Sequence, residues 1–206
     1  MSPIIEIRRV GNLGNTMIQY LAAWKLRAAW PGSVIARGWL PEWGLDEPLA
    51  DPDGATSTLE VPAHTALPFS ALVGIARSGR YDRIVLADSM QRMDCLPDRA
   101  AANALFVTQL DHVRIGDDEL LINVRAEELV LGISNYPLVP ADYYEMIIKT
   151  SQLRPVFLGQ LGPNAYCETL RSRFPHARFI ASQGAMQDFQ TVRSARNIVI
   201  PVSTFS

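Results

Sequence analysis

Cysteine is scarce in this chain of 206 residues: only Cys95 and Cys167 occur, far apart and with no second Cys or His at metal-ligand spacing. That spacing favours free thiols in a reducing cytoplasm over a disulfide framework or a zinc site. Long apolar runs are also missing. None reaches about 18 residues, so we expect no transmembrane segment. The first apolar stretch has its charges inside it rather than before it, which is not typical of a secretory signal.

An excess of charge of one sign is missing as well. The formal net charge is −2, from 19 Lys and Arg against 21 Asp and Glu. This balance gives no electrostatic basis for a nucleic-acid partner, and we expect none. It leaves peripheral association with a membrane surface open. The three histidines fall outside every motif described below, and neither an HxxxH nor a DxD pattern occurs, so we predict no metal site and no cofactor.

What the chain does contain is a repeated alternation of short apolar strands and helices. The predicted strands cover residues 4–10, 33–40, 58–61, 82–87, 119–124, 155–159, 177–181 and 197–202. The predicted helices cover residues 15–30, 68–79, 98–106, 140–151, 164–174 and 185–195, with a long loop at 125–139. This alternation is typical of α/β proteins with parallel sheets covered by helices. A polar break near residue 115 predicts two Rossmann-like halves, residues 1–115 and 116–206. No helix follows the last strand, so we expect the second half to lack its closing helix.

The first motif is the turn "GNLGNTMIQY" after the first strand, with Gly11, Gly14, Asn15 and Gln19. A glycine-containing link from a strand into a helix lets backbone N–H groups approach a ligand at the positive helix end. The dinucleotide fingerprint GxGxxG is absent. The alternative is a purely structural tight turn, in which Asn15 caps the helix and Gln19 bonds to backbone.

The second motif, "INVRAEEL", ends an apolar strand in Asn123 and Arg125, followed by Glu127 and Glu128. An arginine at the carboxyl end of a strand suits bidentate binding of phosphate. The alternative is a solvated loop in which Arg125 pairs with one of the two glutamates.

The third motif is the end of the chain, where the last strand runs into Ser203, Thr204, Phe205 and Ser206. Hydroxyls and N–H groups after a buried strand can form an anion-binding nest. The alternative is an ordinary turn, in which hydroxyl residues are common.

Taken in order, the three motifs resemble the GDP-fucose-dependent fucosyltransferases, nearest the α-1,2-fucosyltransferase family of bacterial and animal glycan synthesis. Its GGLGNQxFQY-type opening turn is matched at six positions, which are Gly11, Leu13, Gly14, Asn15, Gln19 and Tyr20. Its HxRRGD motif is represented by Arg125 alone, with Ala126 in place of the second arginine. Its STFSWW motif is matched by Ser203–Ser206, and the preceding acidic-Phe helix by Asp188 and Phe189.

The resemblance implies a two-domain glycosyltransferase of GT-B type, with an acceptor-side first half and a nucleotide-binding second half. It implies a GDP-sugar donor, a glycan acceptor entering between the halves, and a product that belongs to a cell-surface or secreted polysaccharide. Arg125 would hold the donor diphosphate together with Asn123. Ser203, Thr204 and Ser206 would lie near the phosphates or the nucleotide. The opening turn would face the donor sugar.

An inverting transfer usually needs a general base, and Glu127 and Glu128 are the acids near the right strand end. The eroded second motif leaves another function open, that of a non-catalytic relative which binds a nucleotide or a glycan.

Overall fold

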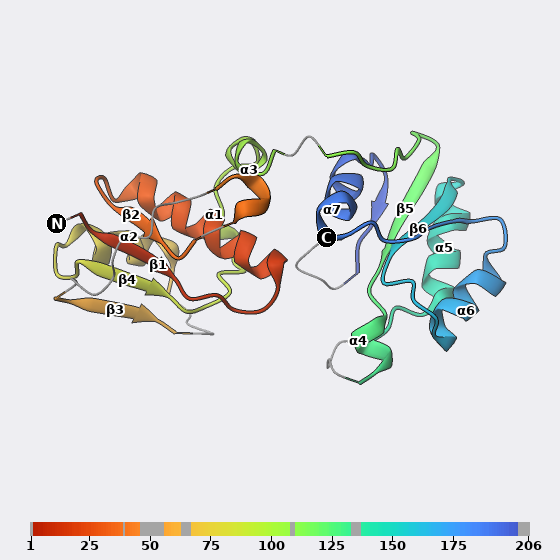
Figure 1. Ribbon diagram of the computed structural model, residues 1–206, viewed down its shortest axis with the longest axis horizontal. Helices are drawn as coiled ribbons and strands as arrows, with labels where there is room; N and C mark the ends of the chain where they lie inside the picture. The colour runs from red at the N-terminus through yellow and green to blue at the C-terminus, as the bar shows by residue number, and fades with distance from the viewer. Residues whose placement is uncertain are drawn as a thin grey trace. The chain divides into compact units, whose positions relative to one another are not determined.

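The computed structural model describes residues 2–38, 40–45, 56–62, 67–107, 110–132 and 137–201, with the side chain of Glu128 outside the description. Within these residues the chain is α/β and carries two separate four-stranded parallel sheets (Figure 1). It divides into two compact units, Met1–Thr108 and Gln109–Ser206. We describe each unit by itself.

The first unit has the strand order β2-β1-β4-β3, with every neighbouring pair parallel. Its elements in chain order are β1 (Ile4–Ile7), α1 (Leu13–Ala29), β2 (Val34–Ala36), a 3-10 turn η1 (Pro41–Trp43), β3 (Thr58–Val61), α2 (Phe69–Arg77), β4 (Arg83–Leu86), a 3-10 turn η3 (Met93–Cys95) and α3 (Arg99–Leu105). Two consecutive parallel strands must be joined by a crossover connection. Here α1 joins β1 to β2, and α2 joins β3 to β4.

The core of the first unit forms where α1 packs on the sheet. Ile7, Ile35 and Tyr20 are almost completely buried. All three converge on Gly38, where a Cβ atom would lie 2.7 Å from Ile35 Cγ2 and 2.9 Å from Ile7 Cδ1. On the other face of β1 lies Glu6, which is buried and pairs with Arg83 and, at 3.2 Å, with Arg37. The paired arginines compensate the cost of burying this carboxylate.

The second unit has the strand order β7-β6-β5-β8, again all parallel. Its elements are β5 (Glu119–Val124), α4 (Glu127–Val130), α5 (Ala141–Ser151), β6 (Arg154–Gly159), α6 (Ala165–Arg173), β7 (Arg178–Ile180), α7 (Ala185–Ser194) and β8 (Ile198–Val199).

Both faces of this second sheet are covered, which is why β5 is buried along its whole length. One face carries Leu120, Ile122 and Val124 of β5 and packs against side chains of α5 and α6. The other face carries Leu121 and packs against Val192 near the end of α7. A central parallel strand buried on both faces is expected to be mostly apolar, as β5 is apart from Glu119 at its start and Asn123 next to its end.

Two local expectations from the sequence are wrong. Asn15 was expected to cap the first long helix, but α1 begins at Leu13 and its N-cap is Asn12, which makes no side-chain cap. The reason is Gly11, whose φ of +74° turns the chain before Asn12. The stretch 125–139 was expected to be a loop throughout, but it contains the short helix α4.

The predicted absence of a closing helix lies outside the described residues, because the description ends at Pro201, just after β8.

Candidate functional site

Each sheet reverses its strand order at one place, and the first and second motifs lie at these two places. In the first unit the chain leaves β1 for β2 on one side and later returns to place β4 on the other side of β1. In the second unit it leaves β5 for β6 and β7, then returns to place β8 beside β5. Ligands of open α/β sheets bind outside the carboxyl ends of the strands at such a switch point.

The first motif follows β1 and is held by the side chain of Gln19. Its Nε2 donates to Arg8 O at 2.8 Å and to Asp88 O at 2.9 Å. Its Oε1 accepts the N–H of Val10 at 3.2 Å. Gln19 therefore ties the turn after β1 to the turn after β4, across the switch point of the first sheet.

Gln19 itself is fully buried, since its exposed fraction is 0%. We therefore interpret Gln19 as a residue that shapes the turn. The groups that face outward are the exposed Gly11 and the half-buried Asn15. Gly14 is buried in the first turn of α1.

Gly11 and Asn15 lie against one another. A Cβ at Gly11 would lie 2.1 Å from Asn15 Nδ2, and the positive φ of Gly11 also disfavours a side chain. The Oδ1 of Asn15 accepts a hydrogen bond from Gln91 Nε2 at 2.8 Å. The turn after β4 thus contacts the first motif twice, through Asp88 and through Gln91.

Asp88 is a residue that the sequence analysis did not select. It follows β4 at the switch point, and only 8% of it is exposed. A buried carboxylate at the carboxyl end of a parallel strand is a candidate functional group. The sequence did carry a signal for it, namely an Asp placed directly after the apolar strand at 82–87.

In the second unit, Asn123 is the penultimate residue of β5 and Arg125 follows the strand. Asn123 is 8% exposed, whereas Arg125 is partly exposed. The neighbouring strand β6 ends at Gly159, whose φ is +117°. A Cβ there would lie 2.4 Å from Val124 O and 2.8 Å from Asn123 Oδ1. Only glycine allows β6 to come this close to the second motif.

The remaining acids of the motif follow at once. Glu127 is exposed and opens α4, and a Cβ at Gly162 would lie 2.9 Å from its Oε1. Glu128 is the second residue of α4, and only its backbone is described. Ala126 is completely buried and belongs to the apolar core beneath the sheet.

Ser203, Thr204 and Ser206 lie outside the described residues. The strand that leads to them, β8, is adjacent to β5, with Leu121 opposite Ile198 and Ile122 opposite Val199. The sequence of the second and third motifs therefore follows two neighbouring strands at the switch point of this sheet.

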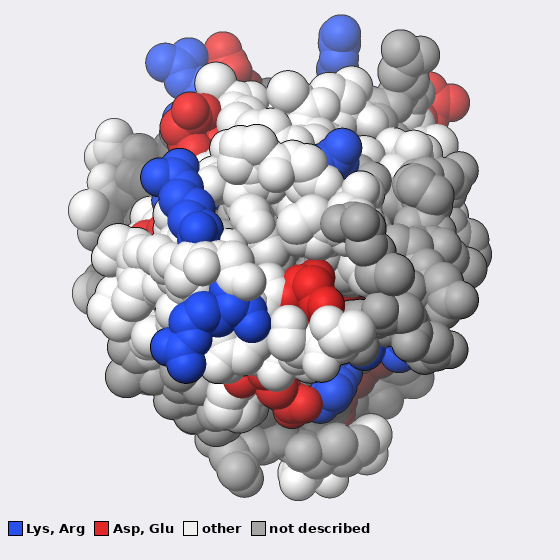
Figure 2. All heavy atoms as spheres, turned by 90° about the vertical axis from the view of Figure 1, so that its left-hand side faces the viewer, with Lys and Arg blue, Asp and Glu red and all other residues white. Residues whose placement is uncertain are grey.

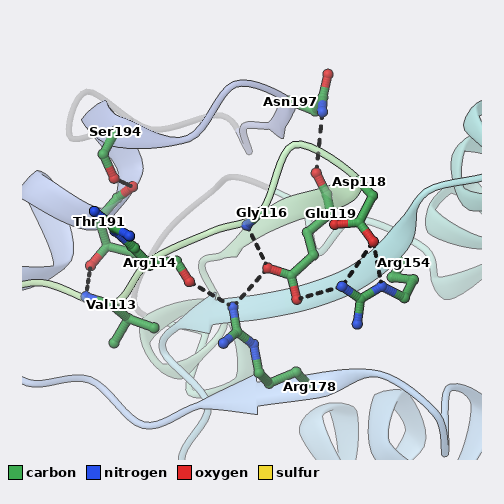
Figure 3. A network of polar contacts seen from close by, with 10 residues as sticks. All are labelled: Val113, Arg114, Gly116, Asp118, Glu119, Arg154, Arg178, Thr191, Ser194 and Asn197. Carbon is green, nitrogen blue, oxygen red and sulfur yellow. Dashed lines mark hydrogen bonds and ion pairs between the residues drawn. The ribbon is translucent and has the colours of Figure 1, made fainter.

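The opposite, amino end of the second sheet is closed by charged and polar contacts (Figure 3). Glu119 at the start of β5 is 7% exposed and accepts the N–H of Gly116 at 2.7 Å. Arg178 at the start of β7 donates to Glu119 at 3.0 Å, and Arg154 at the start of β6 bonds to Asp118 at 2.9 Å. These contacts tie the amino ends of the strands together, so the carboxyl ends are the candidate functional edge.

Neither the charge on one face of the molecule nor the metal ligands among the described residues indicate a competing site. On the face of the molecule drawn in Figure 2, Lys and Arg lie interspersed with Asp and Glu among uncharged residues. No group of three or more His, Cys, Asp or Glu among the described residues is placed to hold a metal ion. In the same residues, no helix has the length and apolar character needed to cross a membrane.

The two cysteines are free and buried. Burial raises the pKa of both the Cys95 and the Cys167 thiol, so both favour the protonated form. A protonated buried thiol is a poor nucleophile, and neither cysteine is a candidate for covalent chemistry.

Of the comparisons with known proteins, only the comparison of structures found a similar protein. No protein-family model matches the chain, and no curated protein matches its sequence. A solved structure of a mutant of Arabidopsis thaliana FUT1 in complex with GDP does match, with a TM-score of 0.54 and 12% sequence identity. The match covers 100% of this chain and 67% of that chain. The chain has a fucosyltransferase-like fold.

Proposed function

We propose that the chain is a glycosyltransferase that transfers a sugar, fucose by the resemblance of its motifs, from a GDP-sugar to a glycan acceptor. In this proposal the two units are the Rossmann-like halves of a GT-B enzyme. The second unit binds the donor nucleotide, and the first lies on the acceptor side. The nearest family is that of the α-1,2-fucosyltransferases.

One observation carries the proposal. The fold resembles that of a GDP-bound FUT1 structure over the whole chain, and the motifs after β1 and β5 occupy the switch points of their sheets. At 12% identity the likeness supports the fold alone. The argument for binding of a sugar donor comes from the positions of the motifs.

Arg125 has the chemistry that the donor requires. Cleaving a glycosyl phosphate bond builds negative charge on the departing diphosphate. A guanidinium at the end of β5 can bind two phosphate oxygens and stabilise that charge more strongly in the transition state than in the ground state. An arginine performs this role without a metal ion, and we propose a metal-independent transfer. Asn123, Ser203, Thr204 and Ser206 are proposed to complete the donor site.

For the acceptor we propose a carboxylate as general base. Glu127 is exposed at the end of β5 and Glu128 is next to it in the chain. Either could take the proton of an attacking hydroxyl. In the first unit, Gly11, Gly14 and Asn15 are proposed to bring backbone against the donor sugar, with Gln19 holding the turn beneath them.

A second function is favoured by Ala126. It stands where the family resemblance places a second arginine, and it is completely buried in the core. This chain therefore offers one cation at a position where the family offers two. The alternative is a non-catalytic relative that binds a GDP-sugar or a glycan without transfer.

Binding of nucleotides tests the proposal directly. GDP, GDP-fucose, GDP-mannose and UDP-glucose would be titrated against the chain and against Arg125→Ala in a thermal-shift or calorimetric assay. A ligand at about 100 times its dissociation constant adds roughly 2.7 kcal/mol of stability. We expect a guanine nucleotide to bind and Arg125→Ala to weaken it. Failure of every nucleotide to bind the unmodified chain would overturn the proposal.

Release of GDP then separates the two functions. Transfer or donor hydrolysis frees GDP, whereas a non-catalytic relative binds the donor and releases none. Since both thiols are free and buried, we also propose that the protein acts in the cytoplasm, where it would build a cell-surface or secreted polysaccharide. Bacterial origin is part of this proposal.

A further inference from the structure

The turn that carries Arg125 is built around the side chain of Gln160, the residue that directly follows the neighbouring strand β6. The side-chain oxygen Oε1 of Gln160 accepts the backbone N–H of Ala126 at 2.8 Å and that of Glu127 at 3.1 Å. The backbone N–H of Gln160 donates to Val124 O at 2.8 Å. Gln160 thus makes three hydrogen bonds to the backbone around Arg125, one to the residue before it and one to each of the two residues after it.

These bonds replace a cap that the local sequence does not supply. Residue 126, which precedes α4, is an alanine and has no side-chain acceptor for the first N–H groups of the helix. Ala126 is also completely buried, so water is not a ready substitute for its partner. Without the oxygen of Gln160, two N–H groups would lose their partner at the point where the chain leaves β5.

Gln160 is itself held by contacts with the end of β6 and with α6. Gly159, with φ of +117°, lets the chain pass close to Val124 before it reaches Gln160. The thiol of Cys167 in α6 lies 3.4 Å from Gln160 O and donates to it. The position of Gln160 is therefore set by β6 and α6. Through its hydrogen bonds to Ala126 and Glu127, Gln160 in turn fixes the turn after β5.

We infer that Gln160 is a positioning residue that fixes Arg125 at the donor edge of the second sheet. This inference rests on the proposed function for its effect on donor binding, and it also makes a structural claim that needs no ligand. Gln160 acts through the backbone on either side of Arg125 and is not itself a catalytic residue. A guanidinium held in place before the donor arrives loses less freedom on binding, which strengthens binding of the diphosphate.

The test compares Gln160→Met, which keeps the side-chain volume and removes the acceptor, with Gln160→Glu, which keeps an acceptor. Gln183→Met makes the same change at an exposed glutamine after β7 and serves as the matched control. The ligand-free readout is hydrogen exchange of the Ala126 and Glu127 amides. We expect exchange at least about 10-fold faster in Gln160→Met, and near the original rate in Gln160→Glu and Gln183→Met. Unchanged exchange in Gln160→Met would overturn the structural claim.

The second readout is the dissociation constant for GDP. We expect Gln160→Met to raise it about 10-fold in the unmodified background, and by less than about 2-fold when Arg125→Ala is already present. Equal factors in the two backgrounds, or no effect in either, would overturn a role through Arg125. If GDP binds none of the proteins, the proposed function fails, and the exchange measurement still decides whether Gln160 holds the turn.

Discussion

Gln19 is the residue on which the geometry of the first motif depends. Gln19→Met keeps the volume of the side chain but leaves Val10 N–H, Arg8 O and Asp88 O without their partner. An unsatisfied buried group costs about 1–3 kcal/mol, and water reaches the partly buried bonds of Arg8 and Val10 more readily than the buried bond of Asp88, so we expect the free energy of unfolding to fall by about 3 kcal/mol. Urea unfolding followed by tryptophan fluorescence measures this change.

Gln91→Met provides the comparison, since Gln91 is exposed and makes one bond to Asn15. We expect a change within about 0.5 kcal/mol there. Equal effects at the two positions would contradict a special structural role for Gln19.

Asp82 makes the stability of the first unit sensitive to acid. Its carboxylate accepts hydrogen bonds from Thr56 N–H, the Thr56 hydroxyl and Ser57 N–H, and these lower its pKa from 3.8 to about 2. Because the folded pKa is depressed, the stabilisation is present above pH 3.8 and is lost as the pH falls from about 4 to about 2. We expect Asp82→Asn to flatten the pH dependence of unfolding in this window, measured by urea titrations at fixed pH values. An equally steep dependence in the variant would assign the acid sensitivity to other groups.

Residue roles could be predicted from the sequence only where the partner is near in the chain. The alternative in which Gln19 bonds to backbone was available, because a glutamine on an apolar face needs partners. That one of its partners is the carbonyl of Asp88 could not be foreseen, because the contact joins residues 69 positions apart. The partner of the Asn15 amide could not be foreseen either, because Gln91 is equally remote in the chain.

At the scale of elements, the meeting of β5 and β6 at Gly159 gives the sharpest prediction. Gly159→Ala places a Cβ 2.4 Å from Val124 O at a φ of +117°. Backbone cannot yield cheaply, so we expect the second unit to lose about 3 kcal/mol or more of unfolding free energy. Far-UV circular dichroism during urea unfolding measures the loss.

Gly132→Ala separates the cost of a positive φ from the cost of a clash between the new Cβ and the backbone. Gly132 has φ of +68°, but a Cβ there would meet nothing within 4 Å. We expect a cost of only about 1 kcal/mol at this site. If both alanine variants lose the same stability, the close approach of β6 to Val124 is not what makes Gly159 necessary.

Elements with a strong local pattern were predictable, and those held by distant partners were not. The strand at 119–124 was predicted with the bounds that β5 has, because four of its six residues are large and apolar and mark a buried strand by themselves. Helix α4 was missed, since its first N–H groups are satisfied by Gln160, more than thirty residues later. Asp88 has a signal in the sequence, its place directly after an apolar strand, but its contact with Gln19 does not. The role of Gln160 could not be predicted, because it depends on hydrogen bonds to residues more than thirty positions earlier in the chain.

At the scale of the whole molecule, the tryptophans report on one unit only. All four, Trp24, Trp30, Trp39 and Trp43, fall within residues 1–108. Glu119→Gln removes the charge that Arg178 and Arg154 pair with at the amino end of the second sheet. We expect it to speed hydrogen exchange in β5 and β6, through a loss of about 1–2 kcal/mol, without moving the tryptophan unfolding midpoint. A shift of that midpoint would show that the two units unfold as one.

The burial of Cys95 and Cys167 has a practical consequence for studying how the two units move. Maleimide dyes react with thiolates, and both natural thiols are buried with raised pKa values. One surface cysteine can therefore be introduced in each unit and labelled with one dye of a fluorophore pair, while Cys95 and Cys167 are left unchanged. Single-molecule energy transfer between the dyes would then follow the separation of the units in real time as a nucleotide-sugar is added.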